Sequence, residues 1–129
     1  MCFTLTVKYQ KHSIAERNIK CYKYTSVYSY TDEFNFRSEC MHFDYTKNKI
    51  YGPTPFQFST LFFAINVGYH SYDKIPELIP SIEGSPIVFK IALFIIPKGA
   101  KYYYNPKEGQ YCSDQIIYKK LIKTIGIEP

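Results

Sequence analysis

The strongest constraint on the fold is an apolar run late in the chain. Ile87–Ile96 reads Ile-Val-Phe-Lys-Ile-Ala-Leu-Phe-Ile-Ile, and Lys90 is its single charged member. A strand that is apolar on both faces is typical of the interior of a sheet, whereas a half-exposed strand alternates. The run is also far shorter than the ~20 residues that a membrane-spanning helix needs. We therefore expect a sheet with this strand at its centre.

The composition also favours strands. The chain has fourteen Tyr and ten Phe, whereas Ala and Leu, which favour helices, are scarce. A length of 129 residues is usual for one domain, and no repeat or linker divides the chain. We therefore expect a single domain, residues 1–129, of the α+β class, dominated by strands with short helices.

Three further segments carry a strand pattern. Phe3–Tyr9 alternates between apolar and polar residues, as a half-buried strand does. In Ile19–Tyr24 the alternation places Tyr22 on one face and Lys23 on the other. Ala100–Tyr104 runs into the turn Asn105–Gly109, so we expect a hairpin there.

The remaining segments are less defined. Lys11–Asn18 is polar and loop-like, and 26–48 is polar and aromatic without a clear period, which indicates short strands and turns. Phe56–Val67 fits either a buried strand or a short helix. Lys74–Ile79 predicts one or two helical turns, with Ser71 or Asp73 as the cap. Gln110–Ile125 fits a helix by the spacing of its apolar residues, although a strand at 113–119 competes with it.

The charge pattern favours a small anionic partner. The net charge is +5, but the sixteen basic residues are scattered along the chain. Proteins that bind nucleic acid usually gather Lys and Arg on one face. The pattern therefore favours a phosphate-bearing small ligand over a long nucleic acid.

The cysteines indicate neither a zinc site nor export. The four Cys form no Cys-x-x-Cys pair, and Cys40 with His42 lacks a second pair of ligands. The first residues lack the basic and apolar regions of a signal peptide. We expect free thiols and a cytoplasmic protein with no membrane partner and no required cofactor. The residues do not indicate an oligomeric state.

Two motifs resemble a group of small uncharacterised proteins of phages and gut bacteria. They are Gly68-Tyr69-His70-Ser71 and the closing Ile96-Pro97-Lys98-Gly99-Ala100-Lys101-Tyr102-Tyr103, together with a Tyr-Lys strand near the start of the chain. The resemblance covers roughly residues 14 to 120. It implies a phage-type protein and supplies no activity.

The order of these segments is also similar to the ADP-ribosyltransferase fold, a split sheet that holds NAD in a central cleft. The resemblance implies that Lys23 stands in place of the Arg that grips the cofactor and Ser71 in place of the first Ser of a Ser-Thr-Ser strand. Asp114 or Gln115 would stand in place of the catalytic Glu, on a strand spanning 113–118.

This comparison also implies that catalysis is weakened. Lys is a point charge where Arg offers a bidentate fork, and Asp is shorter than Glu. Neither Asp114 nor Gln115 would stabilise a ribosyl cation as Glu does. A site that binds the ligand and has lost the chemistry fits this pattern better.

The leading hypothesis is therefore a phage-type protein that binds a nucleotide-like ligand, an NAD-derived or cyclic nucleotide signal, and sequesters it from host defence. Its candidate ligand-binding residues are Tyr22, Lys23, Tyr69, His70, Ser71, Lys98, Tyr103, Ser113, Asp114 and Gln115. The rings of Tyr22, Tyr69 and Tyr103 would stack on a base. Lys23 and Lys98 would meet phosphates.

Each candidate also has a purely structural interpretation. Lys23 would then be a solvated strand residue and His70 a hydrogen-bonded structural one. Lys98 and Gly99 would form only a turn that ends a strand. Two other functions stay open: an ADP-ribosyltransferase-like or nucleotide-hydrolysing enzyme that uses Asp114, and a module that binds and inhibits a host defence protein.

Overall fold

The computed structural model describes residues 5–6, 11–26, 31–38, 43–59, 64–75 and 88–126. Within these ranges the chain forms strands and turns and contains no helix. The prediction of a strand-dominated fold is confirmed. The predicted short helices do not occur in the described part, and most of Lys74–Ile79 lies outside it.

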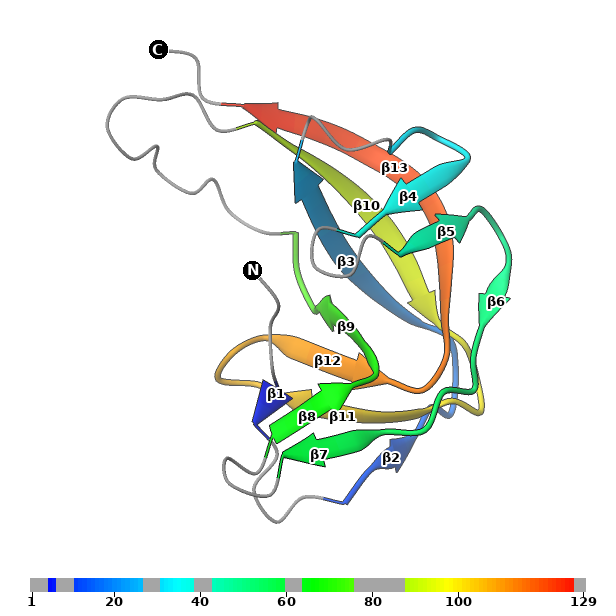
Figure 1. Cartoon of the computed structure of the whole chain (residues 1–129), viewed down its shortest axis with the longest axis vertical. Helices are drawn as coiled ribbons and strands as arrows, with labels where there is room; N and C mark the ends of the chain where they lie inside the picture. The colour runs from blue at the N-terminus through cyan, green and yellow to red at the C-terminus, as the bar shows by residue number, and fades with distance from the viewer. Residues whose placement is uncertain are drawn as a thin grey trace.

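An eight-stranded antiparallel sheet forms the centre of the molecule (Figure 1). Its strands, in spatial order, are β2 (Ser13–Ile14), β11 (Lys101–Asn105), β12 (Gln110–Ser113), β9 (Tyr69–Tyr72), β3 (Ile19–Ser26), β10 (Val88–Ile96), β13 (Ile116–Gly126) and β6 (Ile50–Tyr51). Two smaller sheets accompany it, one of β4 (Asn35–Arg37) and β5 (Asp44–Thr46), the other of β1 (Leu5–Thr6), β8 (Ala64–Val67) and β7 (Gln57–Ser59).

The apolar run takes the central place that its composition predicts. β10 pairs along its length with β3 on one side and with β13 on the other. Its one charged side chain, Lys90, donates from Nζ to the carbonyl of Thr31 at 2.8 Å. Two register shifts between β10 and β13 add local twist and bend, and both strands curve in Figure 1.

The ambiguous segments are resolved where they are described. Gln110–Ile125 forms β12 and most of β13, so the helix is wrong and the strand alternative is correct in type. Its bounds are not, because Asp114 and Gln115 lie between the two strands instead of within one strand over 113–119. The described ends of Phe56–Val67 contain β7 and β8. The expected hairpin is present as β11 and β12. Lys11–Asn18, expected as a loop, contains the short strand β2, which pairs with the start of β11.

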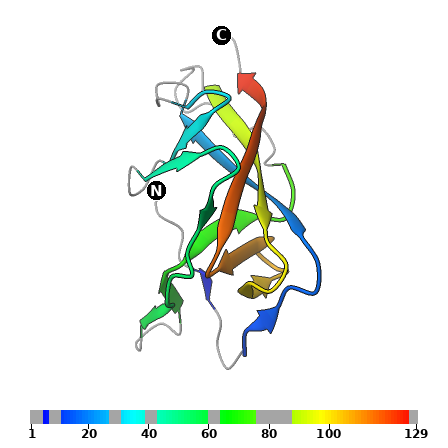
Figure 2. The ribbon, with the colours of Figure 1, turned by 90° about the vertical axis from the view of Figure 1, so that its right-hand side faces the viewer.

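The main sheet consists of two halves joined at a narrow point. The long strands β3, β10 and β13 form the upper half in Figures 1 and 2, and β9, β12 and β11 form the lower half. The halves meet where Tyr22 of β3 pairs with Tyr72 of β9. This join sets which residues of the two halves share a face, because side chains alternate from it along each strand.

The main core lies on one face of this sheet. Phe36 and Tyr45, from the β4–β5 hairpin, pack on Phe94 of β10, with ring centroids 5.0 and 5.2 Å away in edge-to-face geometry. Tyr69 and Tyr111, from the lower half, pack against the same core. One core is therefore shared by both halves, so this face is the inner side of a bent sheet.

A second, smaller core lies on the opposite face of the lower half. It contains Ile65 of β8, Tyr103 of β11 and Cys112 of β12, with Phe56 packed against them. Gly68, between β8 and β9, has a φ of 151°, and an added Cβ would collide with Cys112 Sγ. The three-stranded sheet can approach the main sheet this closely because position 68 has no side chain.

Candidate functional site

Strand alternation divides the candidate residues between the two faces. The registers of β3, β9, β12 and β11 carry no shift, so directly paired residues share a face. On the inner face lie Lys23, Tyr69, Ser71 and Ser113, and on the outer face lie Tyr22, His70 and Tyr103. The other three candidates, Lys98, Asp114 and Gln115, lie in connections between strands. The structure thus brings Lys23, Tyr69 and Ser71 together and separates Tyr22 and Tyr103 from them.

The ammonium group of Lys23 lies among aromatic rings. Lys23 is half-buried, and its Nζ lies 5.4 Å from the ring centroid of Tyr45 and 5.7 Å from that of Phe94. Within the described residues the ion pairs are Arg37 with Asp44 and Lys47 with Glu33, and neither involves Lys23. Ring faces are thus the contacts that stabilise this cation.

This environment lowers the pKa of the Lys23 amine to about 8, because burial disfavours the charged form. The thiols of Cys21 and Cys112 act weakly in the opposite direction. At pH 7 roughly a tenth of the Lys23 amines are then neutral, far more than for an ordinary lysine. A lysine with this property is both a cation for an anionic ligand and a source of free amine.

Ser71 lies beside Lys23. Tyr22 pairs with Tyr72 in antiparallel register, so Lys23 and Ser71 are the next residues on the inner face. Ser71 is 2% exposed, and its Oγ has no oxygen or nitrogen hydrogen-bond partner among the described residues. Its hydroxyl lies near the Cys21 thiol: burial raises the pKa of that thiol to about 12, a side-chain hydrogen bond from Ser71 partly opposes the shift, and the thiol stays protonated. A buried hydroxyl without an oxygen or nitrogen partner at this place is available to a ligand.

Aromatic residues surround this pair of polar groups. Tyr69 lies with its ring centroid 6.2 Å from that of Tyr45, and its hydroxyl is 2.9 Å from Thr54 Oγ1. Tyr111 pairs directly with Ser71 and is half-buried against the main core. We call the set of Lys23, Tyr45, Tyr69, Ser71, Phe94 and Tyr111 the Lys23 site.

Sequence reasoning missed Tyr45, Phe94 and Tyr111. A signal for Tyr111 was present, since the alternation of Gln110–Ser113 puts Tyr111 on the face of Ser113. Tyr45 comes from a short hairpin in a segment without a clear period, so nothing in its neighbourhood pointed to the site. Phe94 was recognised as part of the central strand but was not linked to the site.

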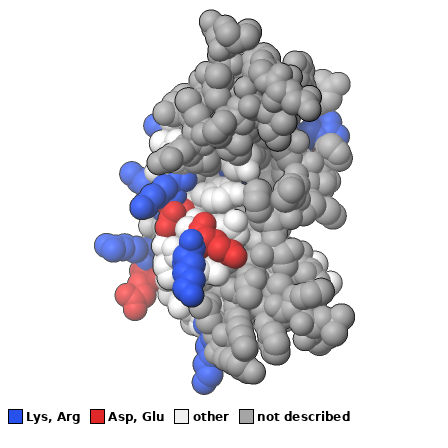
Figure 3. All heavy atoms as spheres, turned by 90° about the vertical axis from the view of Figure 1, so that its left-hand side faces the viewer, with Lys and Arg blue, Asp and Glu red and all other residues white. Residues whose placement is uncertain are grey.

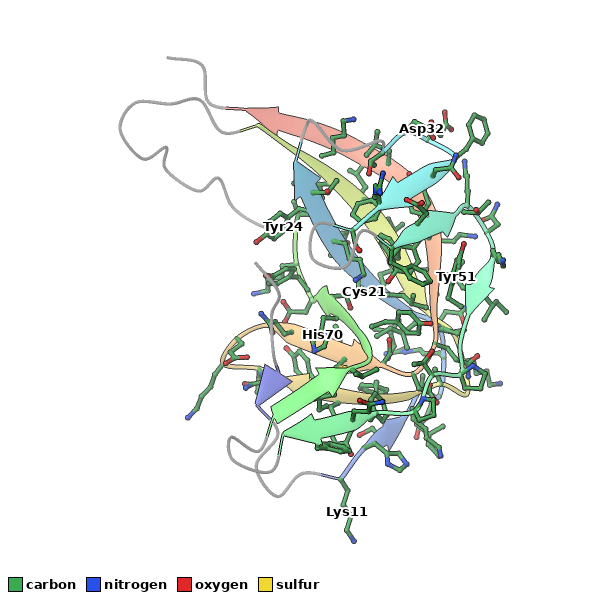
Figure 4. The ribbon with its side chains drawn as sticks, in the orientation of Figure 1. Lys11, Cys21, Tyr24, Asp32, Tyr51 and His70 are labelled. Carbon is green, nitrogen blue, oxygen red and sulfur yellow. The ribbon has the colours of Figure 1, made fainter. Side chains whose placement is uncertain are left out.

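His70 lies on the outer face, under the three-stranded sheet. Figure 4 shows it in the interior, as it does Cys21, whereas Lys11 and Asp32 lie at the periphery. The pKa of His70 is lowered to about 4, mainly by burial and secondly by the positive charge of Lys23. Hydrogen bonds to the backbone of Ile65 and Gly68 oppose this shift. Its Nε2 is buried without a hydrogen-bond partner among the described residues. His70 is therefore neutral at pH 7.

Two other candidates on the outer face, Tyr22 and Tyr103, differ in burial. Tyr22 is half-buried at the join between the two halves of the sheet. Tyr103 is 8% exposed, belongs to the second core, and packs edge-to-face on Phe56 at 5.2 Å. A ring enclosed by core residues has no free face for a ligand, so Tyr103 serves packing in this structure.

Asp114 connects three segments of the backbone. Its Oδ1 accepts a hydrogen bond from the Lys101 N–H at 2.9 Å, and its own N–H donates to the Lys101 carbonyl at 2.9 Å. Its carbonyl accepts from the Thr54 N–H at 2.8 Å. Asp114 comes three residues after Tyr111, which pairs with Ser71. Three residues of extended chain span about 10 Å, so Asp114 lies away from Ser71. In the described geometry its carboxylate holds the start of β11.

The remaining three candidates lie near the ends of strands. Lys98 is exposed, and its backbone N–H donates to Asn18 Oδ1 at 2.9 Å. Ser113 is buried and donates from Oγ to the Tyr69 carbonyl at 3.5 Å. Gln115 is half-buried between β12 and β13.

The described ranges lack both a metal-binding cluster and a helix that could span a membrane. These ranges contain no group of three His, Cys, Asp or Glu side chains suited to a metal ion, and Cys40 and His42 lie outside them. They also contain no helix of the length and hydropathy that crossing a membrane requires. Figure 3 shows acidic and basic side chains side by side on the described part of one face, which agrees with the scattered charges of the sequence.

The comparisons with known proteins leave the site to be interpreted from its chemistry. The chain matches no family model, no curated protein and no solved structure.

Proposed function

We propose that this chain binds a small nucleotide-like ligand at the Lys23 site. The observation that carries the proposal is the placement on one face of Lys23, a half-buried cation without an ion pair among the described residues, and Ser71, whose buried hydroxyl has no oxygen or nitrogen partner there and lies near only the weakly bonding Cys21 thiol. The ligand class is a phosphate-bearing molecule with a planar base, either NAD-derived or a cyclic nucleotide.

The energetics of the two polar groups favour an anion. A buried charge and a buried hydroxyl both lose hydration, and each regains free energy when a partner forms hydrogen bonds to it. A phosphate oxygen is suited to both, because it accepts from an ammonium and from a hydroxyl. Filling the site would then raise the pKa of Lys23 from about 8 towards its ordinary value, with uptake of protons.

The aromatic neighbours of Lys23 and Ser71 favour a ligand with a planar ring. Tyr69 and Tyr111 are half-buried against the main core, on the same face as Lys23 and Ser71. One face of the Tyr111 ring is already stacked on Tyr104, with ring centroids 4.7 Å apart, so a base would have to use Tyr69 or the other face of Tyr111. A base stacked on a tyrosine gains about 1–3 kcal/mol without regard to its identity. A nucleotide offers both groups in one molecule: a base that can stack on tyrosine and a phosphate that can contact Lys23 and Ser71.

Binding without turnover is the better-supported activity. The Asp114 carboxylate, the candidate acid, is engaged with the backbone of Lys101, and the thiol of Cys21 stays protonated. His70 faces the opposite side of the sheet. In a phage-type protein of the host cytoplasm, such a site would act by sequestering a defence signal.

Calorimetry with a panel of NAD-derived and cyclic nucleotides tests this proposal. We expect at least one member to bind, and Lys23→Met to weaken its binding at least tenfold. Lys98→Met is the matched control, because Lys98 is exposed and follows the end of β10, where Ile96 pairs with Ile19, four positions along β3 from Lys23. The bound ligand should be recovered unchanged. The absence of binding across the panel, or binding that Lys23→Met leaves unaltered, would refute the proposal.

A further inference from the structure

We propose that Lys23 also forms a covalent, reversible imine with the aldehyde of its ligand, a nucleotide that carries a free reducing sugar. This inference rests on the proposed function, because it places the bond in the same Lys23 site. It adds a reaction and a narrower ligand class to what binding alone would require.

The surroundings of the Lys23 amine are those of a reactive lysine. Its Nζ lies over the rings of Tyr45 and Phe94 at 5.4 and 5.7 Å, and no carboxylate among the described residues forms an ion pair with it. A nearby carboxylate would hold the amine in its protonated, unreactive form. Desolvation by apolar neighbours does the opposite and is a known way to activate a lysine as a nucleophile.

The reaction balances without an oxidant or a cofactor. The lone pair of the neutral amine attacks the aldehyde carbon, a C–N bond forms, and the carbonyl electron pair moves to oxygen. A proton passes from nitrogen to that oxygen and gives a carbinolamine. The nitrogen lone pair then expels the hydroxyl group, which leaves as water after taking up a proton. Hydrolysis reverses each step.

Ser71 is placed to assist the proton transfers. It follows Lys23 across the β3–β9 pairing on the inner face, and its Oγ has no oxygen or nitrogen partner among the described residues, only the neighbouring Cys21 thiol. A hydroxyl can donate and accept in the same step, so it can pass a proton from the amine to the forming hydroxyl group. The nearby thiol of Cys21, which burial keeps protonated, is a poorer acceptor for that role.

The imine is compatible with the phosphate contact. A protonated imine keeps a positive charge at Nζ, so attraction to a phosphate a few bonds away is retained. ADP-ribose meets both needs, because its terminal ribose opens to an aldehyde and carries a phosphate on the same sugar. ADP and NAD lack a free aldehyde and can only bind without a bond.

Reductive trapping provides the test. The full chain is incubated with ADP-ribose and cyanoborohydride near pH 7.5, and the adduct is located by intact mass and peptide mapping. We expect one adduct on Lys23, formed at least tenfold faster than on the exposed residues Lys98 and Lys101. Lys23→Met should remove it, Lys98→Arg should keep it, and ADP should slow its formation. In urea, where the chain is unfolded, adducts should form on Lys23 no faster than on the other lysines.

The outcomes separate this inference from the proposed function. If ADP-ribose binds in a Lys23-dependent manner but Lys23 is trapped no faster than Lys98 and Lys101, the imine is refuted and the nucleotide site stands. If no nucleotide binds and no selective adduct forms, both proposals fail. Ser71→Ala provides a second check: it should weaken ADP binding through loss of the phosphate contact, and at saturating ADP-ribose the adduct should still form at least threefold more slowly than in the wild type.

Discussion

Lys23 on β3 and Ser71 on β9 both face the inner side of the main sheet, and each is the chain neighbour of one member of the pair Tyr22–Tyr72 that joins these strands. A half-buried cation and a buried hydroxyl are thus both located at the narrow point where the two halves of the sheet meet. Neither forms an ion pair or side-chain hydrogen bond to oxygen or nitrogen among the described residues, so the chain carries a local free-energy cost there. Polar groups left in this state commonly mark a functional site.

Replacement of Lys23 by Met should stabilise the protein while it removes ligand binding. The lowering of the Lys23 pKa from 10.5 to about 8 means that its charge opposes folding below pH 8, where the unfolded chain holds the proton more tightly. After allowance for its partial exposure, we expect Lys23→Met to raise the free energy of unfolding by about 1–2 kcal/mol at pH 7. Urea unfolding measures this change.

The control for that experiment is Lys98→Met. Lys98 is exposed, so its replacement should alter the free energy of unfolding by no more than about 0.5 kcal/mol. A loss of stability in Lys23→Met would show that the Lys23 cation is satisfied in the folded state and that the site has no need of an anion.

Protonation of His70 should make the protein less stable in mild acid. Its folded-state pKa of about 4 lies below the ordinary 6.5, so between these values the unfolded chain binds more protons. The contribution of His70 is therefore complete above pH 6.5 and is lost as the pH falls towards 4, up to about 3 kcal/mol. Urea unfolding of the wild type and of His70→Gln at several pH values isolates this part of the slope.

His12 provides the comparison for His70. It is exposed, so urea unfolding of His12→Gln at the same pH values shows how much of any change comes from replacing a histidine outside the core. Equal slopes for the wild type and His70→Gln would mean that His70 gains a proton as readily in the folded as in the unfolded chain.

Asp114 should contribute to stability rather than to ligand binding. Asp114→Ala removes the acceptor for the Lys101 N–H at the start of β11, and we expect a loss of about 1–3 kcal/mol in the free energy of unfolding. Asp114→Asn keeps a carbonyl oxygen at that place and should lose less. Both variants, where they fold, should bind the nucleotide with the affinity of the wild type when measured by calorimetry. A variant with normal stability and reduced affinity would instead place Asp114 in the site.

The sequence predicts individual strands well because each depends on local information. β10 is apolar on both faces, and the turn Asn105–Gly109 is rich in turn-forming residues, so the central strand and the hairpin could both be expected. The site could be predicted only in part. Alternation within β3 places Lys23 opposite to Tyr22, but the partner strand and its register are long-range properties that no local pattern contains.

The assignment of Tyr22 and Tyr103 as stacking residues shows where this limit lies. Both occur in well-predicted strands, yet the pairing of β3 with β9 and of β11 with β12 puts them on the face away from Lys23. Tyr111 lies beside Ser71 for the same reason. Identifying the site thus required the strand order, and with it the knowledge that β9 and β12 lie between β3 and β11.

Gly68 should tolerate no side chain without a loss of stability. Its φ of 151° is one that side-chain-bearing residues rarely adopt, and a Cβ there would collide with Cys112 Sγ and press on Phe56. We expect Gly68→Ala to lower the free energy of unfolding by about 2–4 kcal/mol, from backbone strain and overpacking together. Adding Cys112→Ala removes the sulfur and should restore part of that loss, whereas strain alone would leave it unchanged.

Gly99 is the matched control, because it also has a positive φ, 91°, but an added Cβ there meets nothing within 4 Å. Gly99→Ala should therefore show only the conformational part, about 1–2 kcal/mol. Equal losses at the two positions, measured by urea unfolding, would contradict the close approach of β8 and β9 to Cys112.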